Sequence, residues 1–335
     1  MIRVGIIGLG MMGGMHYRAW GGIDGAQIVA VADADAKKAA GDLSGSWSNM
    51  PGAATQLDMS AIRGTTDPRE LIAMDEVDLV DICVPTPAHA DLAVAALEAG
   101  KHCVCEKPLA RTAEQARAIA AAAETAKGFC LPAMCVRFWP QWVWLAEAVQ
   151  DGRFGAVLDA TFRRVGATPP GWFANGELSG GAILDLHLHD TDFVKFAFGK
   201  CEAVQCFGRI GKTGCVDQIV SHYLYGDGGP VVTAEGSWAM ADGFPFRMDY
   251  TVNFEQATAE YVMLREQPLM VYREGKAEAV DCPGGDGWQN ELAYMAKCVA
   301  SGKAPTTITA ADAAESIAIV EAEAESVRTG RRVEI

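Results

Sequence analysis

Lys107 is the residue whose chemical type and setting most suggest catalysis. It follows the apolar run 102–105 and stands between Glu106 and Pro108. The run predicts a strand of a parallel sheet, and Pro108 ends that strand. Ligands of open α/β sheets bind at the carboxyl ends of the strands, where an ammonium group can bind a reacting oxygen. We therefore predict that Lys107 is catalytic.

Asp185 and His189 form a second pair suited to proton transfer. They lie four residues apart in a segment with a helical pattern, so we expect them on one helix face, about 5–6 Å apart at Cβ. His189 is the predicted general base, because the ordinary pKa of histidine lies near neutrality. Asp185 is expected to orient the His189 ring or to hold a neighbouring hydroxyl group.

The same segment raises the alternative of a metal site, because His187, Asp190 and Asp192 accompany that pair. Imidazole and carboxylate groups are common metal ligands. Residues two apart do not face each other on a helix, although they share a face on a strand. The helical pattern therefore favours no metal site, and His187 is expected to point away from His189.

A glycine-rich turn, Gly8-Leu9-Gly10-Met11-Met12-Gly13, follows the first apolar run and opens a helical pattern. In a dinucleotide-binding turn the first glycine permits the tight bend and the second lets a pyrophosphate approach. The third lets helix and strand pack closely. We predict that Gly8, Gly10, Met11, Met12 and Gly13 bind the cofactor, the helix start offering unpaired N–H groups.

Asp33 is the expected partner of this turn, because it ends the second apolar run 20 residues after Gly13. A carboxylate there accepts hydrogen bonds from ribose hydroxyls and repels a 2′-phosphate. No Lys or Arg precedes Lys37 in the following residues, so NAD is favoured over NADP. Oxidising an alcohol then needs a base, a group that stabilises the alkoxide and a hydride acceptor. His189, Lys107 and the cofactor supply these.

Apolar runs and helical patterns alternate through the first part of the chain. Strands are predicted at 3–7, 27–33, 78–84, 102–106 and 129–134, with helices at 88–99 and 112–127. This alternation is typical of an α/β fold with a doubly wound parallel sheet, the Rossmann arrangement. We assign residues 1–124 to this NAD(P)-binding domain.

The pattern changes after about residue 135. A helix at 142–150, a strand at 157–165, a helix at 179–198, strand-like pieces from 203 to 280, and helices at 289–300 and 310–329 are predicted. Residues 125–335 should therefore form an α+β domain with a largely antiparallel, open sheet, which we expect to bind substrate and mediate oligomerisation.

Composition narrows the classes of partner. The 335 residues include 43 acids and 28 bases, a net charge of −15, which argues against nucleic acid and anionic membranes. No stretch reaches the ~20 apolar residues needed to cross a bilayer, and no signal peptide is visible, so a cytoplasmic protein is expected. The ten cysteines lack a Cys-x-x-Cys pair and are interpreted as reduced.

With these motifs in place, the chain resembles the Gfo/Idh/MocA oxidoreductases, the family of inositol dehydrogenases and glucose-fructose oxidoreductase. The likeness spans nearly the whole chain, and Glu106-Lys107-Pro108 is its most specific mark. It also includes the glycine turn with His16 after it, His89 in the loop after 78–84, Arg137-Phe138-Trp139-Pro140, and the segment Gly180 to Asp185 with His189 and Asp192. His16 itself is expected to be a packing or capping residue.

The resemblance implies further site residues. Pro85, Thr86, Pro87, His89 and Glu106 are expected along the cofactor with Lys107. Arg137, Arg163, Trp172 and His189 are expected near a sugar or polyol substrate, and the protein is expected to be a homodimer or homotetramer. Two departures stand out: Pro85-Thr86-Pro87-Ala88-His89 differs from the Thr-Pro-Asn loop of many members, and His187 adds a polar side chain.

Two other functions remain open alongside the dehydrogenase. One is a glycosidase that keeps NAD bound and eliminates a leaving group after transient oxidation, without net cofactor reduction. The other is a non-catalytic, nucleotide-sensing binding protein, which the presence of Lys107, Asp185 and His189 disfavours.

Overall fold

The computed structural model describes residues 1–45 and 55–335. They form two compact units, one of Met1–Trp139 with Gly285–Ala314 and one of Pro140–Gly284 with Glu315–Ile335. Each unit is described by itself. The division differs from a boundary at residue 124, because a further strand of the first sheet follows that residue and a later segment returns to the first unit.

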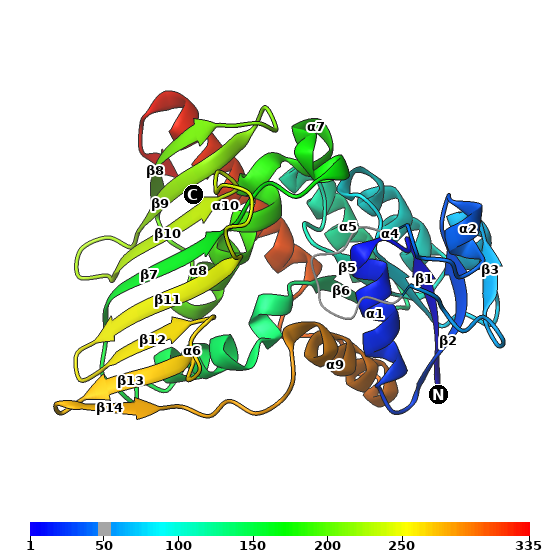
Figure 1. Cartoon of the computed structure of the whole chain (residues 1–335), viewed down its shortest axis with the longest axis horizontal. Helices are drawn as coiled ribbons and strands as arrows, with labels where there is room; N and C mark the ends of the chain where they lie inside the picture. Colours follow the sequence, from blue (N-terminus) through cyan, green and yellow to red (C-terminus); the bar gives the residue numbers. More distant parts are fainter. Residues whose placement is uncertain (46–54) are drawn as a thin grey trace. The chain divides into compact units, whose positions relative to one another are not determined.

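The first unit is built on a six-stranded parallel sheet with the order β3-β2-β1-β4-β5-β6 (Figure 1). Its strands are β1 (Ile2–Ile7), β2 (Ala26–Ala32), β3 (Arg63–Thr65), β4 (Leu79–Ile82), β5 (His102–Glu106) and β6 (Cys130–Ala133). The strand order reverses between β1 and β4, where doubly wound sheets bind their ligands. The doubly wound parallel sheet is thereby confirmed. β4 is buried along its whole length, as expected for a strand covered on both faces.

Short helices connect these strands. They are α1 (Met11–Gly21), α2 (Ala36–Ala39), α3 (Pro68–Ile72), η1 (Thr86–Ala88), α4 (His89–Glu98), α5 (Ala113–Thr125), η2 (Cys135–Phe138) and, after the second unit, α9 (Gly287–Ser301). Side chains set their starts: Thr112 accepts the Gln115 N–H at 3.2 Å, and Asp286 accepts the Gln289 N–H at 2.8 Å. Helix α9 packs on α1 and η2, which is why it belongs to the first unit.

The second unit is built on a nine-stranded sheet with the order β14-β13-β12-β11-β7-β10-β9-β8-β15. Its strands are β7 (Val157–Val165), β8 (Ala203–Ile210), β9 (Val216–Leu224), β10 (Val231–Ser237), β11 (Arg247–Phe254), β12 (Thr258–Val262), β13 (Leu269–Arg273), β14 (Lys276–Ala279) and β15 (Val333–Glu334). Strands β7 and β10 pair in parallel and the other neighbours pair antiparallel. The expected largely antiparallel sheet is confirmed.

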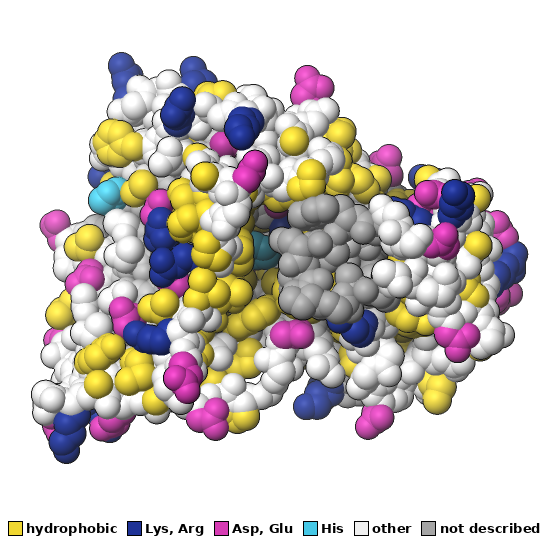
Figure 2. Space-filling view, viewed as in Figure 1, with side chains coloured by type: hydrophobic (Ala, Val, Ile, Leu, Met, Phe, Trp, Pro, Cys, Tyr) yellow, Lys and Arg dark blue, Asp and Glu magenta, His cyan; other side chains and the backbone are white. Residues whose placement is uncertain are grey.

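Helices cover one face of this sheet (Figure 1). They include α6 (Pro140–Gln150), η3 (Gly171–Ala174), α7 (Gly176–Ser179), a π-helix η4 (Ile183–His187), α8 (Leu188–Phe198) and α10 (Ala310–Thr329), whose first residues belong to the first unit. On the opposite face, hydrophobic side chains lie beside Lys and Arg side chains (Figure 2). No helix of the described ranges is long and apolar enough to cross a membrane.

The helix expected at 179–198 begins two residues later than expected, at residue 181, and contains a π-helical turn. Ser179 ends α7, and Gly180 and Gly181 follow with φ of 85° and 72°. A Cβ on Gly181 would lie 2.6 Å from Cys215 Cβ, so the chain passes this point only as glycine. The polypeptide re-enters a helix through the wider π-turn η4, which carries Asp185, and continues in α8, which carries His189.

Candidate active site

The glycine turn lies at the carboxyl end of β1, and each glycine has its own structural reason. Gly8 has a φ of 91°, and a Cβ on Gly13 would lie 1.9 Å from the Gly8 carbonyl oxygen. A Cβ on Gly10 would meet no atom within 4 Å. The first and third glycines therefore permit the turn, and the second leaves the open space that a pyrophosphate requires.

Helix α1 begins at Met11 after this turn, and its cap residue Gly10 provides no side-chain acceptor. Met11, Met12 and Gly13 thus form a first helical turn whose N–H groups are not capped by a side chain. Such a helix end attracts a phosphate through its N–H groups and its dipole.

Asp33 follows β2 and faces the same turn. Its Oδ2 accepts the Leu9 N–H at 2.7 Å, and its Oδ1 accepts the Asp35 N–H at 2.9 Å. The carboxylate therefore fixes the turn, and its remaining lone pairs can accept ribose hydroxyls. Asp35 beside it adds negative charge, which opposes a 2′-phosphate. These features fit NAD better than NADP.

The loop after β4 carries Pro85, Thr86 and Pro87 and ends in His89. His89 is buried, and its Nδ1 and Nε2 lie 2.8 Å from the carbonyl oxygens of Pro108 and Val84, respectively. Burial lowers the pKa of His89, and the two carbonyl contacts oppose that effect. His89 therefore braces this loop against the segment after Lys107, with both ring nitrogens engaged by main chain.

Glu106 ends β5 with its side chain turned into the first unit. Its Oε2 accepts the Lys107 N–H at 2.9 Å, and its Oε1 lies 3.2 Å from His16 Nε2. The Lys107–Pro108 peptide bond is cis. Glu106 is buried, so it stands behind Lys107, whereas the sequence suggested a position along the cofactor.

A buried polar cluster beneath the turn was not expected from the sequence. His16 Nδ1 lies 2.9 and 3.0 Å from the two Asp81 oxygens, and Trp20 Nε1 donates to Asp81 at 2.7 Å. Burial alone would lower the pKa of His16, but the charge of Asp81 and the contacts with Cys83 hold it well above its ordinary value. The sequence feature that could have indicated this cluster is Asp81, a charged residue within the apolar run 78–84.

His16, Asp81 and Cys83 place one ligand atom each within 4.8 Å of one another, close enough to consider a metal ion. Their atoms instead contact each other directly, because Cys83 Sγ lies 3.4 Å from the same His16 Nδ1 that meets Asp81. In this structure the three side chains therefore form a cluster of direct contacts.

Glu291 of α9 adds a third carboxyl group to this region. It is fully buried, and neither carboxyl oxygen has a hydrogen-bond partner among the described residues. Burial first, and then the charge of Glu106, raise its pKa well above the ordinary value. The surroundings of Glu291 therefore favour its protonated, neutral form. Glu291 belongs to the first unit because α9, although it follows residues 140–284 of the second unit in the sequence, packs in the first.

In the second unit, contacts separate the five His and Asp side chains around η4 and α8 into two groups. Asp190 binds Arg164 at 2.9 and 3.0 Å, and Asp192 accepts the Ser316 hydroxyl at 2.7 Å. His187 Nε2 lies 3.1 Å from the Ser221 hydroxyl and 3.3 Å from Glu323. These three side chains anchor the segment to the sheet and to α10. His187 therefore faces β9 and α10.

Asp185 and His189 are the two members of the group suited to chemistry. They are 6% and 8% exposed, so each lies at the edge of the protein interior. The π-turn widens the helix between them, and π-turns are frequent at functional sites. The two residues were expected on a regular α-helix, but a π-helical turn begins their segment. Both still lie in one continuous helical segment.

The expected substrate residues are spread over different places. Arg137 belongs to the first unit, where it is buried and its Nη1 donates to the Thr307 carbonyl at 2.7 Å. Arg163 pairs with Glu235 at 2.7 Å. Because Arg164 points toward α8, its neighbour Arg163 points to the opposite face of the sheet and away from His189. Arg137 and Arg163 thus have structural partners of their own.

Trp172 keeps a position compatible with substrate contact. It is half-buried and stacks on Phe173 with 4.1 Å between ring centroids. Phe173 packs against the buried cluster of Ala182, Leu186 and Trp238, which carries the start of η4. Trp172 therefore belongs to the same local structure as Asp185.

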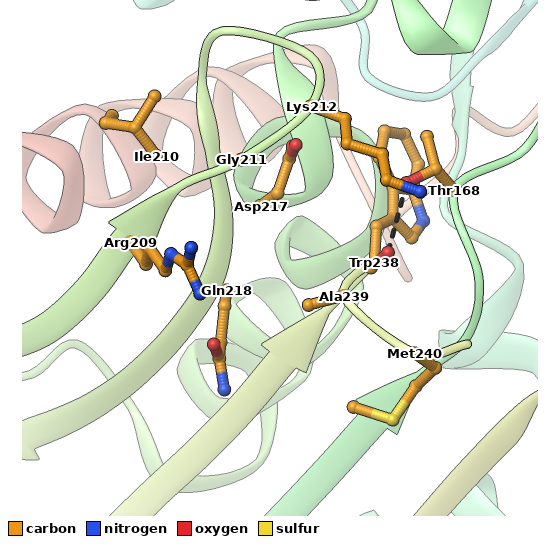
Figure 3. A pocket seen from close by; sticks show the side chains of 10 residues that line it. All are labelled: Thr168, Arg209, Ile210, Gly211, Lys212, Asp217, Gln218, Trp238, Ala239 and Met240. Atoms are coloured by element: carbon orange, nitrogen blue, oxygen red, sulfur yellow. Dashed lines mark hydrogen bonds between the residues drawn. The ribbon is translucent and has the colours of Figure 1, made fainter.

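A hollow with a volume of about 450 Å³ lies beside this segment in the second unit (Figure 3). It is lined by Thr168, Arg209, Ile210, Gly211, Lys212, Asp217, Gln218, Trp238, Ala239 and Met240. Asp217 accepts the Ala182 N–H at 3.3 Å and the Thr213 hydroxyl at 2.7 Å. Asp217, which lines the hollow, thereby holds Ala182, the residue before η4, in place.

Comparisons with known proteins agree with this architecture. Residues 2–133 match the family model described as oxidoreductase family, NAD-binding Rossmann fold, and residues 142–260 match the GFO/IDH/MocA C-terminal domain. Inositol 2-dehydrogenase of Rhizobium meliloti (strain 1021) is 32% identical over 234 residues, which span 65% of this chain and 63% of that protein. The scyllo-inositol 2-dehydrogenase (NAD(+)) of Bacillus subtilis (strain 168) is 26% identical over 100% of this chain and 96% of its own.

Among solved structures, levoglucosan dehydrogenase in complex with NADH and levoglucosan has a TM-score of 0.85. It is 21% identical and covers 100% of this chain and 99% of that chain, a likeness that concerns the fold. The two family models together cover the whole first sheet and strands β7 to β11 of the second. The chain therefore belongs to the Gfo/Idh/MocA family of oxidoreductases.

Proposed function

We propose that this protein is an NAD-dependent dehydrogenase that oxidises a hydroxyl group of a sugar, polyol or related cyclic substrate, or reduces the corresponding ketone. The observation that carries the proposal is the meeting of three features at the carboxyl edge of one sheet. The open glycine turn follows β1, the Asp33 carboxylate follows β2, and Lys107 follows β5. Bound NAD supplies the acceptor for the hydride.

The residues of the chain then manage the proton and the charge. Lys107 binds the reacting oxygen and stabilises the negative charge that develops on it. His189 takes the hydroxyl proton, and Asp185 orients the His189 ring or holds a neighbouring hydroxyl. The anchoring of Asp190 and Asp192 supports this division of roles, because it gives the η4–α8 segment a fixed position on its own sheet.

A polyhydroxy substrate is supported by the relatives, whose names specify inositol and scyllo-inositol as substrates. Trp172 offers an aromatic surface to the apolar face of a ring, and one or two polar groups beside it are enough to fix orientation. We include Trp172 and His189 in the substrate site. Arg137 and Arg163 are left out of it, because both guanidinium groups have partners elsewhere.

The decisive test replaces Lys107 by Met. We expect K107M to lose turnover by at least about 100-fold, the scale on which removal of a charge-stabilising donor acts, while the Kd for NADH changes little. Lys303, exposed in the same unit, provides the matched control K303M, which should behave as wild type. Retention of wild-type kcat by K107M would overturn the role of Lys107.

The substrate should be sought by screening sugars, inositols and their keto forms with NAD and NADP, following both nicotinamide absorbance and products. Accumulation of NADH with a ketone product is the expected result. Hydrolysis without NADH would instead identify the glycosidase, and binding of NADH without any turnover would identify a nucleotide-sensing protein.

A further inference from the structure

We propose that His16 is a positioning residue for Lys107 and acts on it through Glu106. The inference rests on the proposed function, because it assigns a supporting part to the lysine of that site. We call the contacts Asp81–His16–Glu106 the His16 bridge.

The bridge joins three elements of the first unit in one line of contacts. His16 of α1 meets Asp81 of β4 at 2.9 Å through Nδ1 and Glu106 of β5 at 3.2 Å through Nε2. The second contact has the distance of an ion pair, but His16 Nε2 forms no hydrogen bond there. Glu106 then accepts the main-chain N–H of Lys107 at 2.9 Å. The line ends on the residue proposed to bind the substrate oxygen.

Both buried carboxylates, Asp81 and Glu106, need a positive partner, and His16 contacts both. A neutral imidazole donates from one nitrogen only, whereas an imidazolium donates from both. Each carboxylate is buried, and a buried carboxylate without a donor or cation is costly. The pKa of His16 is raised and that of Glu106 lowered by their environment, in spite of the burial that opposes both shifts. His16 is therefore the cation that keeps Glu106 ionised and in place.

Other groups around the bridge are consistent with this charge state. Trp20 donates to Asp81 at 2.7 Å, so Asp81 has a second donor. The Cys83 thiol has a raised pKa because of burial and of Asp81, and it adds no charge. The pKa of Glu291 is raised, so its surroundings favour the neutral form. The cluster thus holds one cation against two anions, with the Lys107 ammonium group as a further cation beyond Glu106.

The position of His16 also links the cofactor turn to the lysine. His16 follows Gly13 by three residues, one turn further along α1. The helix whose start receives the pyrophosphate is thereby tied to the end of β5, two strands away from β1 in the sheet. A misplacement of about 1 Å at a reacting group can cost about 100-fold in rate, so this tie is expected to affect catalysis more than binding.

The test compares wild type with H16Q, measuring kcat, the substrate KM and the Kd for NADH. Glutamine offers a donor at one end and an acceptor at the other, so one carboxylate loses its partner. We expect kcat to fall about 10- to 100-fold at saturating NAD, with NADH Kd changed less than about 3-fold. H102Q is the matched control, because His102 begins β5, the strand that ends in Glu106. His102 accepts the Phe129 N–H at 3.0 Å, and glutamine can do the same.

A double-mutant cycle shows whether His16 acts through Glu106. If it does, H16Q combined with E106Q should lose little more than the larger of the two single losses, since both changes break the same contact. Fully multiplied losses would overturn the proposal. So would an H16Q variant that keeps wild-type kcat, or one that loses only NADH affinity.

A measurement on the wild-type protein covers the case in which H16Q does not fold. The ¹⁵N shifts of the six histidines, with His16 assigned through Trp20, which lies four residues further along α1, should show both His16 nitrogens protonated at pH 8. A neutral His16, or a stoichiometric metal ion on it, would overturn the bridge. If no polyol or sugar is oxidised, the proposed function fails, whereas these shifts still decide whether the bridge exists.

Discussion

At the scale of single residues, Glu291 is a carboxyl group in a place that disfavours its charge. It has a raised pKa in the folded protein because of burial and of Glu106. The folded state therefore binds a proton that the unfolded state releases above about pH 4.5. The contribution of Glu291 to the free energy of unfolding therefore falls as the pH rises from about 4.5 to the pKa that Glu291 has in the folded protein.

Replacing Glu291 by Gln should remove this slope, because Gln is neutral at every pH and has nearly the same shape. We expect E291Q to gain stability relative to wild type by about 1 kcal/mol per pH unit between about pH 5 and 7. Urea unfolding at three pH values measures the difference. The exposed Glu98 gives the control E98Q, and a constant difference between E291Q and wild type across pH would contradict the prediction.

The roles of some residues can be predicted from the local sequence, whereas those of others depend on the packing of distant elements. Lys107 and the glycine turn are visible because their function depends on neighbours in the sequence and on the end of a strand. Asp81 becomes a partner of His16, and Glu291 becomes buried, only in the folded first unit, where α9 packs on α1. The sheet face of Arg163 could not be predicted from the sequence, because a shift of one residue along a strand changes the face, and the apolar pattern around Arg163 and Arg164 does not decide it.

At the scale of elements, the entry to η4 depends on Gly181. Its φ of 72° and the nearby Cys215 leave no room for a side chain. Alanine there must either shift the turn around Cys215 or move η4, which carries Asp185. We therefore expect G181A to lower both stability and kcat.

The control for this change is G152A, because Gly152 also has a positive φ, 65°, but a Cβ there meets no atom within 4 Å. Both variants carry the backbone strain, and G181A adds the steric clash. Thermal unfolding should show G181A to be less stable than G152A by about 1–3 kcal/mol. Equal stability of the two variants, with unchanged kcat in G181A, would show that the turn tolerates a side chain.

The prediction of elements succeeded where apolar runs or glycine stops were strong. The helices at 113–125 and 89–98 and the strands at 2–7 and 102–106 lie within a few residues of their expected bounds. Strand β3 (Arg63–Thr65) has three residues and no apolar run, so only its pairing with β2 defines it. The start of the helix at 181–198 was misplaced by two residues, because glycine spacing alone does not distinguish a bend from a helix start.

At the scale of the whole molecule, the open face of the nine-stranded sheet is where we expect subunits to meet. Phe207 and Val231 are 63% and 62% exposed there, and Val220 lies opposite Phe207 in the register of β8 and β9. Exposed apolar side chains gathered on one sheet face are typical of interaction surfaces. The protein is expected to form a homodimer or homotetramer through this face.

The variant F207E/V231E should lower the mass measured by light scattering toward that of a monomer. Two carboxylates on each copy add repulsion to a chain that already carries a net charge of −15. Leu264, 58% exposed in the turn between β12 and β13, gives the control L264E. An unchanged mass in F207E/V231E would place the subunit interface elsewhere.

The return of α9 has a consequence for synthesis on the ribosome. The first 139 residues supply all six parallel strands, yet α1 and η2 lack their covering helix until residues 287–301 have emerged. A nascent chain therefore exposes α1 and η2 of its nucleotide-binding unit while strands β7 to β14 of the second sheet are translated. Chaperone binding to stalled chains should accordingly persist past residue 139 and end only after about residue 301 has left the exit tunnel.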